Sequence, residues 1–217
     1  MNGRRAVVFD IGKVLVNFDP ALAVRNLAAA TGARAELVER ALFAGHHREA
    51  YSCGRLDAAG FHTAFAAALV RGCADAGLPS PRALTFEAFD RAWSEMFWPM
   101  EGMDALAAEV AALCPVLLCS NTDPLHYRYL QATVPSLRLA RHAVLSYEVG
   151  EEKPGPAIYA VLQSRVPVPP ACALFVDDRA DNVAGAHRAG FDALQFTDAA
   201  ALRGELRARG LLVAAAD

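Results

Sequence analysis

The sequence predicts an α/β fold: a doubly wound parallel-sheet (Rossmann-like) core with a helical cap inserted after the first strand. Four short apolar runs are nearly continuous rather than alternating, as in parallel strands that are buried on both faces. Helical patterns follow the second, third and fourth runs, which is the alternation of a doubly wound core. The apolar runs cover residues 6–9, 116–119, 143–145 and 173–176.

Each element of the core has a local reason in the sequence. Asp123 is expected to cap a helix whose first position is Pro124, because an aspartate accepts the free N–H groups there and proline needs none. Gly190 follows another helical pattern, where glycine is the usual terminator. The expected core helices cover residues 102–113, 123–134, 153–166 and 180–190, and a weaker fifth strand covers 193–196.

The segment between the first two strands is too long for one crossover connection, and a structureless loop of that size is unusual inside a compact domain. It has helical periodicity instead. We therefore expect an α/β core made of residues 1–17 and 100–217, and a helical cap made of residues 18–99. The four amphipathic helices expected in the cap cover residues 20–32, 35–45, 57–72 and 85–97.

Composition excludes several classes of function. The chain has 217 residues, a formal net charge of -3 and no long basic run, so neither nucleic acid nor an anionic membrane surface is an expected partner. No apolar stretch approaches the roughly 18 residues of a membrane span. Five widely spaced cysteines without a CxxC pair predict free thiols, and we expect a cytoplasmic protein. The oligomeric state is left open.

Polar residues follow the apolar runs where the strands end, and the carboxyl ends of the strands are where doubly wound sheets bind ligands. Each of these residues alone has a plain alternative role as a helix cap, a turn residue or a solvated charge. Three carboxylates at one sheet edge, however, repel one another unless a cation neutralises them, and hard oxygen ligands suit Mg²⁺. The residues are Asp10, Ser120, Asn121, Lys153, Asp177 and Asp178.

Other ligand motifs are not supported. The stretch DDRADN resembles the start of a calcium loop, but it has no glycine at the sixth position, and Arg188 stands where the twelfth-position glutamate would be. There is no GxxxxGK[ST] phosphate loop and no GxGxxG dinucleotide motif.

Four segments taken in order resemble the motifs of the haloacid dehalogenase superfamily of aspartate-nucleophile hydrolases: VVFDIGKVL, LLCSNTD, the lysine of EEKPGPAIY, and LFVDDRADN. The resemblance spans the whole core, and the inserted segment lies where the superfamily carries a helical cap. Within the superfamily, FDIGKVLV, SNTDPLH, KPGPAIY and DDRADNVAGA look most like the bacterial alpha-glucose-1-phosphatase group. They are also similar to the N-terminal phosphatase domain of soluble epoxide hydrolases.

The resemblance implies a nucleophile and a metal site. Asp10 would attack phosphorus and become an aspartyl phosphate. Its other carboxylate oxygen would bind Mg²⁺ together with the carbonyl oxygen of Gly12 and with Asp177. Asp178 would hold waters of the metal or help to place Lys153.

The resemblance also implies a phosphate site. The Ser120 hydroxyl and the Asn121 N–H would bind phosphate oxygens, and Lys153 would offset the charge on Asp10 and on the phosphate. Lys13 is unusual beside these motifs, because related phosphatases have a small or amide residue there. Its amino group either reaches the phosphate or is a solvated charge.

The sequence departs from typical phosphatases of the superfamily at Gly12, where they carry a second aspartate that protonates the leaving oxygen and later activates water. The glucose-1-phosphatase group shares this departure. Loss of such an acid–base group typically removes about 10²–10⁴-fold in rate. The cap is expected to select the substrate, and the candidate residues are Phe18, Asp19, His46, His47, Arg48, Tyr51, Trp93, Phe97 and Trp98. For Phe97 and Trp98 we favour packing at the hinge between cap and core, and His46 and His47 equally fit an exposed helix end.

These observations predict a Mg²⁺-dependent phosphatase that acts on a small phosphorylated metabolite, such as a sugar 1-phosphate. One alternative is a 2-haloacid dehalogenase-like hydrolase, which needs no metal and also fits a glycine at position 12, although the Asp177–Asp178 pair is useful mainly around a cation. The other alternative is a non-catalytic phosphate-binding regulator, which the absence of an acid at Gly12 would favour.

Overall fold

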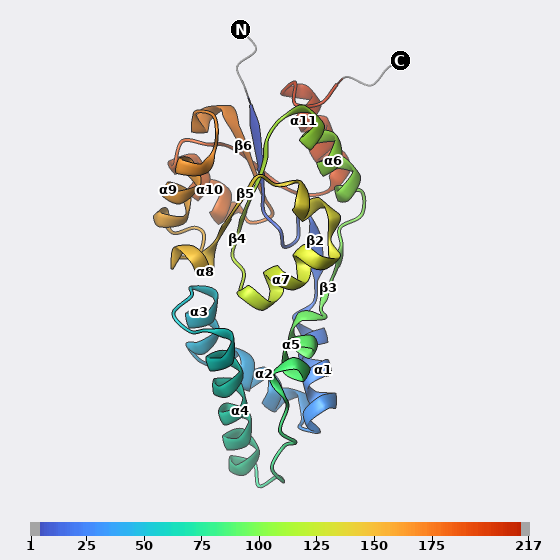
Figure 1. The fold of residues 1–217 in the computed structure, drawn as a ribbon, viewed down its shortest axis with the longest axis vertical. Helices are drawn as coiled ribbons and strands as arrows, with labels where there is room; N and C mark the ends of the chain where they lie inside the picture. Colours follow the sequence, from blue (N-terminus) through green and yellow to red (C-terminus); the bar gives the residue numbers. More distant parts are fainter. Residues whose placement is uncertain (1–4, 214–217) are drawn as a thin grey trace.

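The computed structural model describes residues 5–213. The C-terminal AAAD, which we expect from its sequence to be a loose tail, lies outside this range. The core is a five-stranded parallel sheet in the order β5-β4-β1-β6-β7 (Figure 1). Its central strand is the first one in the chain, as expected for a doubly wound sheet. The strands are β1 (Ala6–Phe9), β4 (Val116–Ser120), β5 (His142–Leu145), β6 (Ala173–Asp177) and β7 (Asp192–Gln195).

Helices cover both faces of this sheet, and alternate residues of the strands face the two layers. Val7 and Phe9 of β1 pack in one apolar cluster with α6 and α11, whereas Ala6 and Val8 pack in another with α9 and α10. Burial on both faces explains why the strands read as continuous apolar runs. The core helices are α6 (Met103–Leu113), α7 (Pro124–Thr133), α8 (Ser146–Val149), α9 (Pro156–Arg165), α10 (Ala180–Arg188) and α11 (Ala199–Ala208), with 3-10 turns η1 (Pro135–Leu139) and η2 (Pro170–Cys172).

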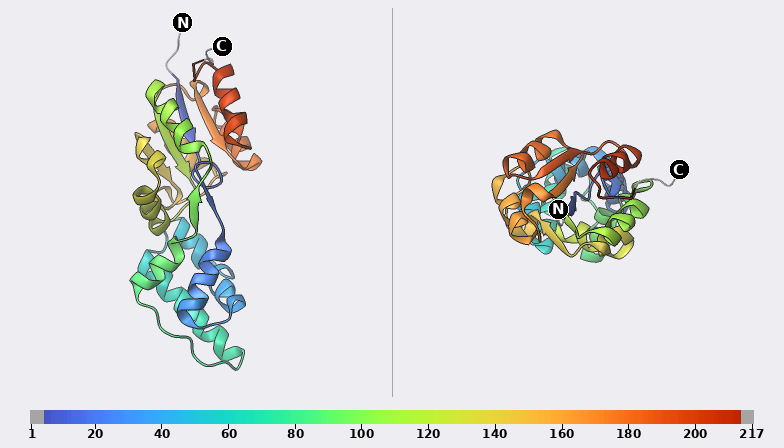
Figure 2. Two further views of the ribbon diagram at one scale, coloured as in Figure 1. Left: turned by 90° about the vertical axis from the view of Figure 1, so that its right-hand side faces the viewer. Right: turned by 90° about the horizontal axis from the view of Figure 1, so that it is seen from above.

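The inserted segment is helical and lies at one end of the long axis of the molecule (Figure 2). Its own apolar cluster is centred on aromatic side chains such as Tyr51, Phe61 and Trp93. We propose residues 18–99 as the extent of this cap. Its helices are α1 (Pro20–Thr31), α2 (Ala35–Phe43), α3 (His47–Ser52), α4 (Ala58–Asp75) and α5 (Phe86–Ser94).

Two short strands join the cap to the core, which the sequence patterns did not predict. β2 (Val16–Phe18) and β3 (Phe97–Pro99) pair antiparallel, and the rings of Phe18 and Phe97 lie 5.8 Å apart. The expected packing of Phe97 at this connection is confirmed, whereas Trp98 is 42% exposed. The chain thus leaves and returns to the core through one paired ribbon.

A second contact between cap and core lies beside α3. The Ser146 hydroxyl donates a 2.7 Å hydrogen bond to the carbonyl oxygen of Ser52, and the Ser52 hydroxyl donates to Glu152. Gly54 has a φ of 66°, and a Cβ there would meet the carbonyl oxygen of Tyr147 at 2.1 Å. Glycine at this position therefore permits the close approach of the two parts.

Two further expectations concern the chain as a whole. All five cysteines are free thiols, as predicted. Within the described residues, none of the helices combines the length and apolar character that crossing a bilayer requires.

Candidate active site

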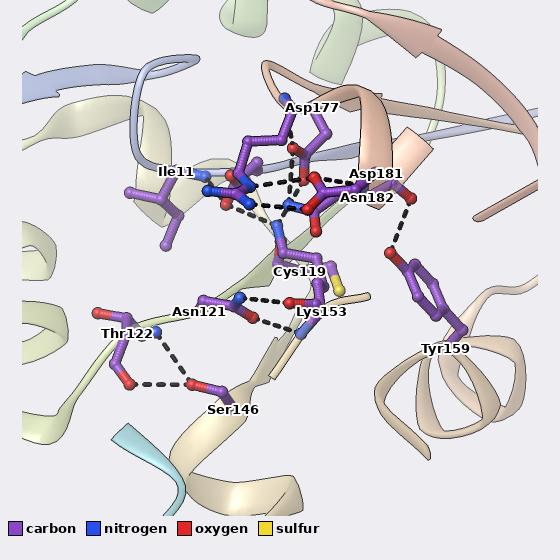
Figure 3. Close-up of polar contacts among 12 residues, drawn as sticks. Ile11, Cys119, Asn121, Thr122, Ser146, Lys153, Tyr159, Asp177, Asp181 and Asn182 are labelled. Carbon is purple, nitrogen blue, oxygen red and sulfur yellow. Dashed lines mark hydrogen bonds and ion pairs between the residues drawn. The ribbon is translucent and has the colours of Figure 1, made fainter. Parts of the chain in front are cut away.

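Lys153 lies at the centre of the predicted site and is only 4% exposed. Its Nζ contacts three oxygens: Cys119 O at 2.8 Å, Asp177 Oδ2 at 2.7 Å and Asp10 Oδ1 at 2.9 Å (Figure 3). Burial alone would lower its pKa, but the two carboxylates outweigh burial and raise it. Lys153 is therefore a fixed positive charge whose three donors are all used.

Asp10 is the first residue after β1, and neighbouring groups orient its carboxylate at the end of that strand. Its Oδ1 accepts from the Ile11 N–H at 2.7 Å and contacts Lys153, while Oδ2 accepts no hydrogen bond from the described residues. Burial and the nearby Asp177 raise the pKa of Asp10 to about 6, against the lowering effect of Lys153. One oxygen is thus fixed in direction, and the other retains its lone pairs for a ligand or an electrophile.

Asp177 ends β6 and is fully buried. Besides Lys153, it accepts from the Arg179 N–H at 3.0 Å and from Asn182 Nδ2 at 2.9 Å, both at Oδ1. The register pairs Phe9 with Val176, so Asp10 and Asp177 lie level at the same edge of the sheet. The strand pairing therefore brings the two carboxylates together, as the sequence predicted.

The third carboxylate, Asp178, is half-buried, and burial and Asp177 raise its pKa. Oxygens of Asp10, Asp177 and Asp178 all lie within 4.8 Å of one another. Three carboxylates and one lysine leave two negative charges without a partner in this cluster. A divalent cation would balance them.

The polar atoms around the cluster also fit Mg²⁺. Asn182 is 1% exposed, and its Oδ1 has no hydrogen-bond partner among residues 5–213, although its Nδ2 donates to Asp177. A buried oxygen without a donor is costly unless a cation or an ordered water occupies the space beside it. Asn182 thus adds a neutral oxygen to three charged ones, which is the hard donor set that Mg²⁺ prefers.

Ser120 ends β4 and Asn121 follows it, but their side chains have different roles. Asn121 clamps the backbone of Lys153: its Nδ2 donates to Lys153 O at 2.9 Å, and its Oδ1 accepts from Lys153 N at 2.7 Å. Ser120 is buried, and its hydroxyl forms no hydrogen bond with the described residues. The Ser120 hydroxyl therefore remains free for a ligand, and the Asn121 side chain positions the lysine.

The turn after Asp10 contains the two residues that the sequence analysis singled out as unusual. Lys13 has a φ of 59°, the only positive value of a non-glycine residue in the described chain, so the strained position of this turn is Lys13 rather than Gly12. Gly12 is needed for another reason, because a Cβ there would lie 3.0 Å from Cε1 of Phe18. The Lys13 amino group donates to Asn17 Oδ1 and to the carbonyl oxygen of Phe18, which holds this side chain beside the turn.

A cavity of about 450 Å³ opens over the carboxylates. Three residues that line it were not predicted as site residues: Glu152, Arg179 and Asn182. For Asn182, the amide side chain at the end of DDRADN was the only feature of the sequence that could have indicated a role in the site. The predicted residues in its lining are Asp10, Gly12, Lys13, Ser120, Asn121, Lys153 and Asp178, joined by Phe18 and Arg48 of the cap side.

Four of the cap candidates line cavities at the site. Phe18 and Arg48 line the cavity over the carboxylates, and both of them, together with Trp93 and Phe97, line a smaller cavity beside it. His47 and Tyr51 are used within the structure: His47 Nε2 lies 2.7 Å from Ala41 O, and the Tyr51 hydroxyl accepts from the Leu125 N–H at 3.2 Å. Neither His47 nor Tyr51 lines either cavity.

A family model of haloacid dehalogenase-like hydrolases matches residues 4–190. This span includes the three carboxylates, Ser120, Lys153 and the entire cap. The chain belongs to the haloacid dehalogenase-like hydrolases.

Solved structures have the same fold. A haloacid dehalogenase family enzyme from Bacteroides thetaiotaomicron, in complex with magnesium and inorganic phosphate, is 18% identical over 91% of this chain and 96% of that chain, with a TM-score of 0.73. A predicted hydrolase of the same family from Porphyromonas gingivalis is 22% identical over 94% and 98%, with a TM-score of 0.68. The L-2-haloacid dehalogenase from Xanthobacter autotrophicus is 22% identical over 94% and 83%, with a TM-score of 0.61.

Proposed function

We propose that this protein is a Mg²⁺-dependent phosphatase that hydrolyses a small phosphorylated metabolite through an aspartyl-phosphate intermediate. The observation that carries the proposal is the cluster of Asp10, Asp177 and Asp178 around one saturated lysine, which leaves two negative charges to be balanced. The magnesium and phosphate bound by the Bacteroides enzyme of the same fold support this reading.

The side chains provide the parts of a nucleophilic displacement. A carboxylate oxygen of Asp10 attacks phosphorus, the bond from phosphorus to the leaving oxygen breaks, and its electron pair departs with that oxygen. Water then attacks the phosphorus of the aspartyl phosphate, which releases inorganic phosphate and restores Asp10. The Ser120 hydroxyl and the Asn121 N–H orient the phosphoryl oxygens, and Lys153 keeps the carboxylates in place.

Mg²⁺ would be held by Asp10 and Asp177, with the Gly12 carbonyl oxygen, Asp178 and Asn182 around it. When bound, it supplies positive charge that lets a phosphate dianion approach a carboxylate. The need for Mg²⁺ distinguishes the phosphatase from a haloacid dehalogenase, in which the aspartate attacks carbon and no metal is needed.

We propose a sugar 1-phosphate as the favoured substrate. Gly12 leaves no carboxylic acid beside the leaving oxygen, so the reaction should favour groups that leave easily without a proton. An anomeric hydroxyl is more acidic than a primary hydroxyl, and sugar 1-phosphates should therefore react faster than sugar 6-phosphates. The finer resemblance of the motifs to the alpha-glucose-1-phosphatase group is in agreement with this chemical argument.

A phosphate-release screen tests the proposal. Aryl phosphates, sugar 1-phosphates and sugar 6-phosphates are offered with Mg²⁺ or with EDTA, to the wild type and to Asp10→Asn. Of these two proteins, only the wild type should turn over, and only with Mg²⁺. The matched control is Asp181→Asn, which changes an exposed carboxylate paired with Arg179 and should keep the activity. EDTA-resistant release of halide from 2-haloacids would favour the dehalogenase, and binding of phosphate without any turnover would favour the regulator.

A further inference from the structure

Two cavities adjoin above the sheet edge, and they differ in character. The larger is lined by Asp10, Asp178 and Lys153, whereas the smaller, of about 120 Å³, has an apolar wall that includes Phe43, Trp93 and Met96. A phosphate ester would place its phosphoryl group in the first and its organic part toward the second. The residues common to both linings are Gly12, Phe18, Arg48, Ser120 and Asn121.

The bond that breaks must lie where the two cavities meet, because phosphorus and the leaving oxygen lie on either side of it. Among the five shared residues, only Arg48 has an ionisable side chain. Gly12 is also one of them, so the position without an acid and the cap arginine border the same space. Arg48 is therefore placed to act on the leaving oxygen.

Among the cations of the larger cavity's wall, Arg48 is the one without a partner in the part of the chain that the structure describes. Lys153 is bound to two carboxylates, Arg179 pairs with Asp181, and Lys13 donates to Asn17 and Phe18 O. Within residues 5–213 the Arg48 guanidinium forms no hydrogen bond or ion pair. Its donors are free for a ligand.

Helix α3, which carries Arg48, is fixed to the core rather than free to swing. Ser52 at its end is held by Ser146 and Glu152, and Tyr51 accepts from the Leu125 N–H. The anchored end lies one helical turn from Arg48, so the backbone that carries this arginine keeps its place relative to the sheet edge.

We propose that Arg48 stabilises the leaving oxygen in place of the absent acid; this role rests on the proposed phosphatase function. As the bond from phosphorus breaks, negative charge collects on the leaving oxygen, and the guanidinium donates hydrogen bonds to it. Arginine stays protonated, so it transfers no proton. The departing alkoxide takes its proton from water, and the resulting hydroxide or another water completes the hydrolysis of the aspartyl phosphate.

The test compares leaving groups of graded acidity. Values of kcat/KM are measured for aryl and sugar phosphates of similar charge with the wild type, Arg48→Gln, Arg48→Lys and Lys13→Met. Arg40→Gln is the matched control, because Arg40 is an exposed arginine of the cap that lines neither cavity. Melting curves of each variant exclude loss of folding.

Arg48→Gln is expected to lower kcat/KM by about 10²-fold for sugar phosphates, as when an oxyanion donor is removed, and by much less for nitrophenyl phosphate. In Arg48→Gln the plot of log kcat/KM against leaving-group acidity should be steeper than in the wild type, and the slope for Arg48→Lys should lie between these two. Added guanidinium should restore part of the rate that Arg48→Gln loses. Parallel plots for the wild type and Arg48→Gln, or a steeper plot for Lys13→Met only, would overturn the role. Absence of any wild-type turnover would instead overturn the phosphatase proposal, and this role with it.

Discussion

Asp10→Asn should stabilise the protein when no metal is present, even though it removes the proposed nucleophile. Asp10 is 7% exposed, and its pKa is raised from 3.8 to about 6. A difference of about two pKa units corresponds to about 3 kcal/mol by which the folded state disfavours the charged form at neutral pH. Asparagine keeps an oxygen for the Ile11 N–H and removes the charge. We expect a gain in unfolding free energy of about 2 kcal/mol, or about 4–8 °C in Tm.

The stability difference between the wild type and Asp10→Asn should depend on pH in a definite direction. Because the folded pKa lies above the unfolded one, the folded state holds a proton that the unfolded state loses between these two values. The cost of the charge is therefore absent below about pH 4, grows as the pH rises, and is complete above pH 6. Urea unfolding of the wild type and Asp10→Asn in EDTA, from pH 4 to pH 7.5, should show a stability difference that widens over this window.

The control is Asp181→Asn, because Arg179 lowers the pKa of this exposed carboxyl and the difference should have the opposite sign or vanish. If Asp10→Asn is less stable than the wild type at pH 7 in EDTA, or if the difference is independent of pH, the account of a strained carboxylate cluster is wrong. Mg²⁺ should reverse the order, because it stabilises the folded state that binds it.

Two further changes test neighbouring parts of the site. Asp177→Ala should abolish Mg²⁺-dependent turnover and, unlike Asp10→Asn, should destabilise the metal-free protein by about 3 kcal/mol, because Asn182 Nδ2 and the Arg179 N–H lose their acceptor and Lys153 loses one of its three. Urea unfolding in EDTA measures this, and an unchanged or raised stability would contradict it. Gly12→Asp should cost about 1–3 kcal/mol, because its Cβ meets Phe18 at 3.0 Å. In Gly12→Asp/Phe18→Leu, where the ring is absent, the new acid should raise kcat/KM most for poor leaving groups, and equal gains for all substrates would show that it does not act on the leaving oxygen.

Much of the core could be predicted from the sequence, because its strands are buried on both faces and leave continuous apolar runs. The rule that parallel strands end at one sheet edge was enough to bring Asp10 and Asp177 together. Local signals were equally reliable where they act within one turn: Asp123 caps α7 through the N–H groups of Leu125 and His126, with Pro124 first in the helix, as predicted.

The features that were missed depend on contacts far apart in the chain. β2 and β3 have three residues each, which is too few for a recognisable periodicity. They are strands because they pair with each other at the two ends of the inserted segment. Helix α3 has only six residues and is held by Ser146 and Glu152 of the core. The role of the Asn121 side chain in clamping Lys153 joins residues 32 apart, and no local pattern reports it. The left-handed backbone at Lys13 has no signal in the sequence, because glycine is the usual residue at such positions.

The most direct test of the central claim, that Asp10 attacks phosphorus, is to trap the covalent intermediate. The wild type is mixed with the best substrate of the screen and Mg²⁺, quenched in acid, reduced with borohydride, and digested for mass spectrometry. An acyl phosphate is reduced to the alcohol, so the account predicts homoserine at position 10, dependent on both substrate and Mg²⁺ and absent from Asp10→Asn. Rapid turnover with no reduced Asp10, or with the reduced residue elsewhere in the chain, would contradict it.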